Sequence, residues 1–332
     1  DKTIVIVNAS TPMELGPLMS GEYEADAILC VGSLGATGST AVGKLLTGEY
    51  NPSGRTTDIW PADFTADPTF ANFGGKHYTD VSGFYEKNYN NVASEGTAYF
   101  VEYKEGVYMG YRYYETAAAE AAAGNYPGFD YDAAVTFPFG FGLSYTSFKR
   151  ELLDVTHEGE DLLAKVRVTN EGQVAGRDVA QLYATAPVRQ GVDKSAAVLV
   201  AFAKTDELAP GEAAELELRC CERDLASWDV SAGCWVLDAG SYAISLRSDS
   251  HTVIDQRELS LGEKRFQTDS ATGNPVRNRF DEVTDYMDAY VTQLSRADFA
   301  GTFPAPVQDK TAASVGLVLK EYDVAEHVDP SD

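Results

Sequence analysis

The stretch Val135-Thr-Phe-Pro-Phe-Gly-Phe-Gly-Leu-Ser-Tyr-Thr-Ser-Phe148 decides the fold of this chain, because the sequence pattern differs on its two sides. Three phenylalanines, two glycines and a proline fall between Phe137 and Ser144. Before this stretch, short apolar runs alternate with helix-like segments. After it, apolar and polar residues alternate with the period of two that is typical of strands. We therefore place the join between an α/β region and an all-β module here.

The α/β region is indicated by two short, nearly continuous apolar runs, residues 3–8 and 25–32. Such runs fit strands that are buried on both faces of a parallel sheet. We expect a helix between them and a second helix at about residues 38–47, with Gly48 as its C′ residue. Residues 50–100 are rich in Asn, Gly, Pro, Asp and Tyr, and we expect mostly long loops there, which are often functional.

The all-β module is indicated by alternating segments such as residues 164–169, 215–219 and 242–247. Turn signals separate these segments, including Asn170–Gly172 and Pro210–Gly211. About seven strands over about 110 residues predict an immunoglobulin-like or fibronectin type III-like β-sandwich.

The last part of the chain changes pattern again. Six apolar residues follow a helical spacing, which predicts one amphipathic helix: Phe280, Val283, Met287, Tyr290, Val291 and Leu294. The Pro- and Ala-rich segment 302–307 predicts an extended linker. The expected domains are an α/β sandwich (1–148), a β-sandwich (149–262) and a linker or tail (263–332).

Composition excludes several classes of protein. The chain has 332 residues and a formal net charge of −25, a field that repels a phosphate backbone and argues against nucleic acid. No apolar run approaches the length of about 18–20 residues that a membrane span needs, and no signal-peptide pattern opens the chain. The four cysteines show no zinc-site spacing and are too few for a disulfide framework, so we expect reduced thiols in a cytoplasmic protein. Cys30, within an apolar run, is expected to be a small core residue.

The richest polar and aromatic cluster is Tyr103-Lys-Glu-Gly-Val-Tyr-Met-Gly-Tyr-Arg-Tyr-Tyr-Glu115. Charged groups among tyrosines suit a sugar, which stacks on aromatic rings and hydrogen-bonds to charged side chains. The candidate substrate-binding residues are Glu105, Tyr108, Tyr111 and Arg112. The alternative interpretation is a strand with a buried Arg–Glu pair and tyrosines packed at a domain junction.

Other motifs are weaker. Gly38–Lys44 resembles a phosphate-binding P-loop, but Leu45 stands where a Ser or Thr would hold magnesium. We therefore expect a helix start, and we expect neither a metal nor a cofactor. The segment Gly142–Thr146 lacks the second glycine of a nucleophile elbow.

Four blocks in order resemble the C-terminal region of family 3 β-glucosidases. They are Ala27–Gly35 with Leu45-Leu-Thr-Gly-Glu-Tyr-Asn-Pro-Ser-Gly-Arg55, Tyr103–Glu115, Phe137–Thr146, and Val166–Gly176 with Val179-Ala-Gln-Leu-Tyr183. Together they span nearly all of residues 1–262. The resemblance implies a partial α/β sandwich followed by a fibronectin type III-like domain.

The resemblance also implies a retaining hydrolase with an aspartate nucleophile on a barrel domain and a glutamate acid/base. Neither role is assigned here, because the barrel is not visible and Glu14, Glu22 and Glu95 lie in no matching motif. The segment Leu294–Pro304 resembles the one that follows the fibronectin-like domain in members with reversed domain order, where the barrel comes last. The resemblance thus places both catalytic carboxylates outside this chain: the aspartate on a barrel in cis or in another chain, and the glutamate in the α/β sandwich, upstream of the segment corresponding to Thr3–Asn8.

Three functions remain open. The first is part of a β-glucosidase-like enzyme that acts on a β-glucoside or oligosaccharide, with this chain lining the cleft and orienting the barrel. The second is a non-catalytic carbohydrate-binding or protein-interaction module. The third, a P-loop nucleotide binder, is disfavoured by Leu45. An incomplete α/β sheet would expose an edge strand and an apolar face, so oligomers or poor solubility are expected for the chain alone.

Overall fold

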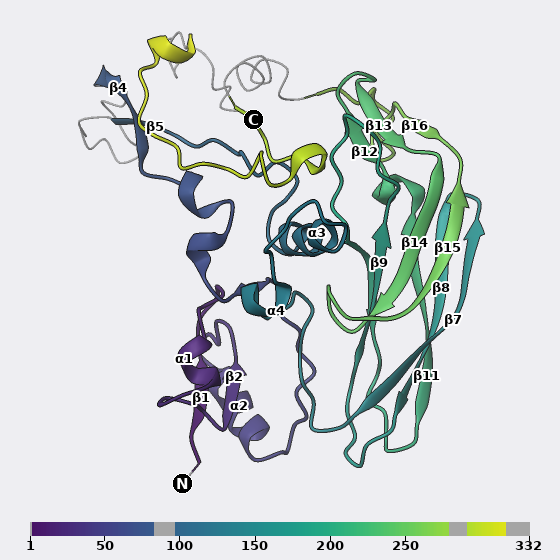
Figure 1. The fold of residues 1–332 in the computed structure, drawn as a ribbon. Coiled ribbons are helices and arrows are strands. Elements are labelled where there is room, and N and C mark those ends of the chain that lie inside the picture. The colour runs from purple at the N-terminus through teal and green to yellow at the C-terminus, as the bar shows by residue number, and fades with distance from the viewer. Residues whose placement is uncertain (1, 83–96, 279–290, 317–332) are drawn as a thin grey trace, which may run out of the picture. The chain divides into compact units, whose positions relative to one another are not determined.

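The computed structural model describes residues 2–82, 97–278 and 291–316. The chain divides into two compact units (Figure 1). The first comprises residues 1–67, 105–278 and 294–303, and the second comprises residues 68–104, 279–293 and 304–332. No helix in the described ranges is long and apolar enough to cross a bilayer.

The first unit begins with a small parallel sheet, as predicted. Strand β1 (Ile4–Val7) pairs in parallel with β2 (Ala27–Cys30). The helix between them is a single turn, α1 (Gly16–Met19), and α2 (Ser39–Leu46) follows β2. Gly48 lies one residue past the helix C-cap Thr47 with φ of +75°, a left-handed conformation, so its prediction as C′ residue is confirmed.

The expectation that these strands are buried on both faces is wrong. Ile4 and Ile6 are 49% and 41% exposed, and Cys30 is exposed instead of lying in a core. The reason is that the described sheet has two strands, and its small apolar cluster around Val7, Leu15 and Trp60 covers one face only partly. This is the exposed apolar face expected of an incomplete α/β sheet.

The exposure of Cys30 predicts unequal thiol reactivity. Cys30 should react quickly with a thiol reagent in the native chain, whereas Cys220 and Cys234 are 3% and 2% exposed and should react only after unfolding. Burial also raises the pKa of Cys220 to about 12, which removes its reactive thiolate. Native labelling followed by mass spectrometry checks this, with Cys30→Ser as the control that loses the fast label. Equally fast labelling of Cys220 and Cys234 would contradict the fold.

A second apolar cluster forms where the α/β region approaches the β-module. Its members include residues of β6 (Val135–Phe137), α3 (Tyr111–Ala122) and α4 (Tyr131–Ala134), and Ile59, which directly precedes β3 (Trp60–Pro61). Helix α4 starts where the N-cap Asp130 accepts hydrogen bonds from the backbone of Asp132 and Ala133. The cluster is strongly aromatic: Tyr108, Tyr113, Tyr114 and Phe299 are its large buried members.

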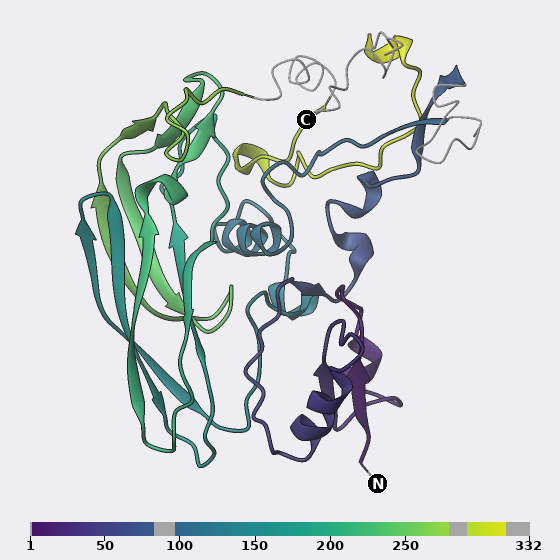
Figure 2. The ribbon, with the colours of Figure 1, turned by 180° about the vertical axis from the view of Figure 1, so that it is seen from behind.

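The all-β module is a two-sheet sandwich, which confirms the predicted fold class (Figures 1 and 2). One sheet has the order β11-β8-β7 and the other β10-β9-β14-β15, all antiparallel. The strands are β7 (Phe148–Glu158), β8 (Asp161–Asn170), β9 (Val179–Thr185), β10 (Val198–Lys204), β11 (Ala213–Cys221), β14 (Gly240–Arg247) and β15 (Val253–Leu261).

The core of the sandwich explains the period of two in the sequence. Ala164, Val166 and Val168 of β8 have no exposed surface. Ile244 and Leu246 of β14, in the other sheet, belong to the same hydrophobic core. A small third sheet is formed by β12 (Ser227–Asp229), β13 (Cys234–Leu237) and β16 (Lys264–Phe266), beside the one-turn helix η3 (Glu222–Leu225).

Where the structure describes the second unit, few residues lie in helices or strands. It contains the hairpin strands β4 (Lys76–Ser82) and β5 (Thr97–Phe100) and the short helices η2 (Phe70–Asn72) and η5 (Ala313–Val315). The tail returns to this hairpin, since Thr79 donates a backbone hydrogen bond of 2.8 Å to the carbonyl of Lys310. The predicted amphipathic helix lies mostly outside the described residues.

The first unit also contains the one-turn helices η1 (Phe64–Ala66) and η4 (Arg296–Asp298). Each begins at a side-chain cap: Asp63 accepts a hydrogen bond from the backbone of Thr65, and Ser295 accepts one from Ala297.

Candidate functional site

The segment Tyr103–Glu115 forms a loop that leads into helix α3. Tyr108 closes a turn by donating its N–H to the carbonyl of Glu105 at 3.0 Å. Gly110, with φ of +54°, directs the chain into the helix, which starts at Tyr111. The alternative interpretation of this segment as a strand is therefore wrong, because a left-handed glycine and the Ala-rich stretch after it favour a helix.

Two of the four candidate residues point into the protein. Tyr108 has no exposed surface, and its hydroxyl donates to Asp193 Oδ1 at 2.7 Å. Its ring also packs edge-on against Phe299. Glu105 is 4% exposed, and burial raises the pKa of its carboxyl above the usual range. Both side chains are buried and present no open surface to a sugar, and the contacts of Tyr108 hold the loop in place.

The other two lie at the start of α3. Tyr111 is half-buried, and its ring stacks on Phe139 at 4.5 Å between centroids. The Tyr111 hydroxyl accepts a hydrogen bond of 3.1 Å from the backbone of Leu199 on β10. Arg112 is exposed, and so are the flanking Val107 and Met109, at 45% and 52%. Arg112 is therefore the candidate that can reach a ligand directly.

The alternative interpretation expected a buried Arg–Glu pair in this segment, but Arg112 is exposed and Glu115 has other partners. Its buried carboxylate accepts hydrogen bonds from the hydroxyls of Tyr131 at 2.7 Å and Ser250 at 2.8 Å, and it meets His251 Nδ1 at 3.0 Å. Ser250 and His251 are more than 130 residues away in the sequence, so no local pattern points to this cluster.

The Asn51-Pro-Ser-Gly-Arg55 turn joins the α/β region to the β-sandwich. The Asn51 side chain donates to the carbonyl of Ala175 at 3.0 Å. Its oxygen accepts from Ser144 Oγ at 2.9 Å and from the backbone of Tyr145 at 2.8 Å. A single asparagine thus connects this turn to the Phe137–Ser144 stretch and to the sandwich.

Arg55, at the end of the same turn, enters a buried ion network. Asp178 is fully buried and pairs with Arg55 and with Arg150, whose Nε and Nη2 lie 2.6 and 2.7 Å from its two oxygens. Arg55 also donates to the carbonyl of Gly142. Burial lowers the pKa of Arg55 below its ordinary value, and the charge of Asp178 opposes this shift. The sequence placed Arg55 in a motif but gave no sign of Asp178 as its partner.

The P-loop-like segment does not present a phosphate site. Gly38 is the N-cap of α2, and Ser39 to Lys44 are helical. Lys44 lies in the last turn, where its ammonium pairs with Glu49 at 2.8 Å and donates to the hydroxyl of Tyr50 at 3.1 Å. In the described ranges, no three His, Cys, Asp or Glu side chains gather as metal ligands would.

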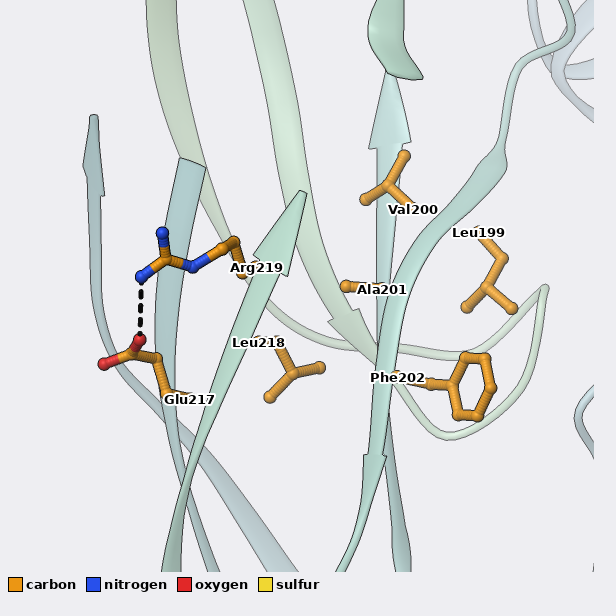
Figure 3. Close-up of a pocket in the computed structure, with 7 residues that line it drawn as sticks. All are labelled: Leu199, Val200, Ala201, Phe202, Glu217, Leu218 and Arg219. Atoms are coloured by element: carbon orange, nitrogen blue, oxygen red, sulfur yellow. Dashed lines mark ion pairs between the residues drawn. The ribbon is translucent and has the colours of Figure 1, made fainter. Parts of the chain in front are cut away.

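A shallow cavity of about 330 Å³ lies between the edge strands β10 and β11 of the sandwich (Figure 3). Its apolar wall comes from Leu199 to Phe202 and Leu218, and its charged rim is the 3.5 Å ion pair between Arg219 and Glu217. None of the four candidate residues lines it.

Comparison with known proteins identifies both parts of the chain. Residues 1–111 match the profile of the Glycosyl hydrolase family 3 C-terminal domain, and residues 178–250 match that of the Fibronectin type III-like domain. A beta-glucosidase of Ruminococcus albus is 32% identical over 257 residues, which cover 75% of this chain and 23% of that protein. Beta-glucosidase A of Butyrivibrio fibrisolvens is 32% identical over 66% of this chain and 25% of its own length.

Solved structures give the same result. Beta-glucosidase 3B from Thermotoga neapolitana in complex with glycerol superposes with a TM-score of 0.62 at 33% identity, over 80% of this chain and 32% of that one. The GH3 beta-glucosidase of Bifidobacterium adolescentis superposes with a TM-score of 0.61 at 26% identity, over 82% of this chain and 36% of that one. The chain therefore spans about a quarter to a third of the length of these relatives.

Proposed function

Because this chain carries the C-terminal domain of glycosyl hydrolase family 3 joined to a fibronectin type III-like domain, we propose that it is part of a retaining, β-glucosidase-like enzyme. The substrate class is a β-glucoside or a short oligosaccharide with a terminal β-linked sugar. The observation that carries the proposal is the match of 257 residues to a beta-glucosidase, which covers 75% of this chain and so reaches into both domains.

The catalytic carboxylates are proposed to lie outside this chain. Retaining hydrolysis needs two carboxyl groups about 5–5.5 Å apart, one as nucleophile and one as acid/base. The relatives are three to four times longer than the matched part, which leaves room for a barrel domain that carries the nucleophile. Glu14 and Glu22 are exposed, and Glu14 accepts a hydrogen bond from the backbone of Phe64, a structural role. Glu95 lies outside the described residues.

The proposed role of this chain is to wall the cleft and to orient the barrel. The barrel comes in cis or from another chain, and the tail segment Leu294–Pro304 is consistent with the reversed domain order. Arg112 is the proposed direct contact to sugar hydroxyls, since it is exposed, as are Val107 and Met109 of the preceding loop. Glu105, Tyr108 and Tyr111 are proposed to act on the same site by fixing the loop and the first turn of α3.

A cytoplasmic location is part of the same proposal. It is supported by the four cysteines, all of which are free in the structure. Disulfides are rare in reducing compartments, whereas free thiols are usual there.

Replacing Arg112 with alanine tests the proposed site. In the enzyme that contains this chain together with its barrel, R112A should raise KM for a β-glucoside by about ten-fold, the effect of losing one charge-assisted hydrogen bond of about 1.5 kcal/mol. The change should fall mainly on KM if the contact is equal in the ground and transition states. Initial rates with p-nitrophenyl β-glucoside check it.

The matched control is Arg265→Ala, at an arginine whose side chain is 55% exposed and paired with Glu263 on the small sheet. This variant should leave KM unchanged. If R112A also leaves KM and kcat unchanged, Arg112 does not touch the substrate and the site assignment fails, while membership in the family stands.

A further inference from the structure

The hairpin turn between β14 and β15 contacts helices α3 and α4 of the α/β region. Its residue Ser250 is fully buried and donates its backbone N–H to the carbonyl of Phe139 at 2.8 Å. Asp249 shapes the turn by accepting backbone hydrogen bonds from His251 at 3.0 Å and Thr252 at 2.7 Å. Arg247, at the end of β14, donates to the carbonyl of Ser250 at 2.6 Å. The turn is therefore rigid and presents two side chains, Ser250 and His251, to α3.

The carboxylate of Glu115 on α3 contacts both Ser250 and His251. The Glu115 side chain is 5% exposed and accepts from Ser250 and from Tyr131 of α4 at one oxygen, while the other oxygen faces His251 Nδ1. A buried carboxylate is stable only when its desolvation is compensated by hydrogen bonds or by an opposite charge. Of its three partners, the imidazole alone can supply a charge.

His251 is placed to gain and lose a proton. Its ring stacks on Tyr131 with centroids 3.6 Å apart and planes 10° from parallel. The side chain nevertheless remains 40% exposed, so it can exchange a proton with solvent while Nδ1 stays on the buried carboxylate. The stack and the hydrogen bond together fix the ring orientation.

The charged and titratable groups around His251 come from every element that packs against it. Glu115 belongs to α3, Tyr131 and Asp132 to α4, and Asp249 to the turn itself. Arg247 of β14 is the cation in this surrounding, held against the ring of Tyr183 and bonded to Ser245 and Ser250. Three carboxylates against one arginine favour a positive charge on the imidazole.

We propose that His251 and Glu115 form a proton-operated latch that ties the β14–β15 turn to helices α3 and α4. When His251 is protonated, an imidazolium–carboxylate pair holds the turn. When it is neutral, only a hydrogen bond between neutral imidazole and carboxylate remains, together with the Ser250 and Tyr131 bonds. Because Glu115 lies one helical turn after Arg112, the latch also fixes the first turn of α3, whatever the function of that turn.

The direction of the effect follows from the electrostatics. The hydrogen bond to Glu115 raises the pKa of His251 above its ordinary value, and burial opposes this rise. A raised folded-state pKa adds stability that is fully present below the unfolded value of about 6.5 and is lost as the pH rises through the folded value. The latch is therefore closed in acid and weak at alkaline pH.

Hydrogen exchange of residues 248–252 in the whole chain tests the latch. Wild type and His251→Gln are compared at about pH 5.5 and about pH 8.5, on either side of the ordinary histidine pKa. Comparing the two proteins at one pH cancels the intrinsic pH dependence of exchange. We expect several-fold faster exchange in H251Q in acid and nearly equal exchange in alkali. An equal ratio at both pH values would mean that the turn is held by packing alone and would overturn the proposal.

A matched control and a second readout keep the test decisive. His157→Gln makes the same change at a histidine that meets Glu222 at 2.9 Å within the sandwich, and it should leave residues 248–252 unaffected at both pH values. In addition, an NMR titration of the wild-type His251 ring should give a pKa above the ordinary value, and Glu115→Gln should lower it. A wild-type pKa at or below the ordinary value would refute the latch even if E115Q does not fold.

Discussion

Replacing Asp178 with alanine is expected to lower the free energy of unfolding by about 3–5 kcal/mol, the range for breaking a buried ion pair by removing one partner. Asp178 is fully buried, and its two oxygens serve Arg55 and Arg150, whose side chains are 12% and 13% exposed. The variant leaves two guanidinium groups side by side in a water-poor site with no counter-charge. Repulsion and unpaired N–H groups then add to the loss.

Urea unfolding followed by circular dichroism measures this effect. Asp178→Asn separates charge from shape, because it keeps the volume but removes the charge, and it should also be strongly destabilising. The control is Glu215→Ala, which breaks the Arg167–Glu215 pair on the sandwich surface, where both side chains are about half exposed. The loss of unfolding free energy in this control should be small, since water already solvates both groups. A D178A variant as stable as E215A would contradict the buried network.

Replacing Gly140 with alanine is expected to destabilise the chain by about 2–4 kcal/mol, from backbone strain plus a lost buried hydrogen bond. Gly140 lies in the Phe137–Ser144 stretch with φ of +81°, where an L-residue is strained. An added Cβ would also lie 2.1 Å from Oε1 of Gln181, so that side chain must move. Gln181 cannot move freely, because its amide donates to the carbonyls of Gly140 and Ser248 at 3.0 Å each.

Gly159→Ala is the matched control for this substitution. Gly159 has a similar φ of +70°, but nothing lies within 4 Å of an added Cβ. It should cost only the strain of the left-handed backbone, about 1–2 kcal/mol. The difference between the two variants in the free energy of unfolding, measured with denaturant, gives the cost of the contact between the added Cβ at Gly140 and Gln181. Equal losses would show that the join between the domains tolerates a side chain there.

The β-sandwich was predictable because strands such as β8 bury one face and expose the other. In β8 the buried residues alternate with the exposed Lys165 and Arg167, and this produces the period of two in the sequence. In the two-stranded β1–β2 sheet, the apolar pattern did not predict burial correctly. Its apolar runs predicted burial on both faces, but Ile4, Ile6 and Cys30 remain exposed, since apolar composition says what a strand favours and not what covers it.

The candidate site was less predictable. The sequence drew attention to Tyr103–Glu115 by composition, but it could not tell that Tyr108 is fully buried while Arg112 is exposed. That distinction depends on the left-handed turn at Gly110 and on where α3 begins. Glu115 meets Ser250 and His251, and Arg55 meets Asp178, across more than 120 residues of sequence, and pairings at such separations leave no local pattern.

The measurement that tests the central claim most directly is hydrolysis of p-nitrophenyl β-glucoside by the purified chain, alone and with a barrel-containing partner that supplies both catalytic carboxylates. The account predicts release of p-nitrophenol only when the barrel is present, because the nucleophile and the acid/base are assigned to residues outside this chain. Turnover by the chain alone would contradict that assignment and would return the search to its own aspartates and glutamates. A complex with the barrel that forms but stays inactive would contradict the proposed role of this chain in the enzyme.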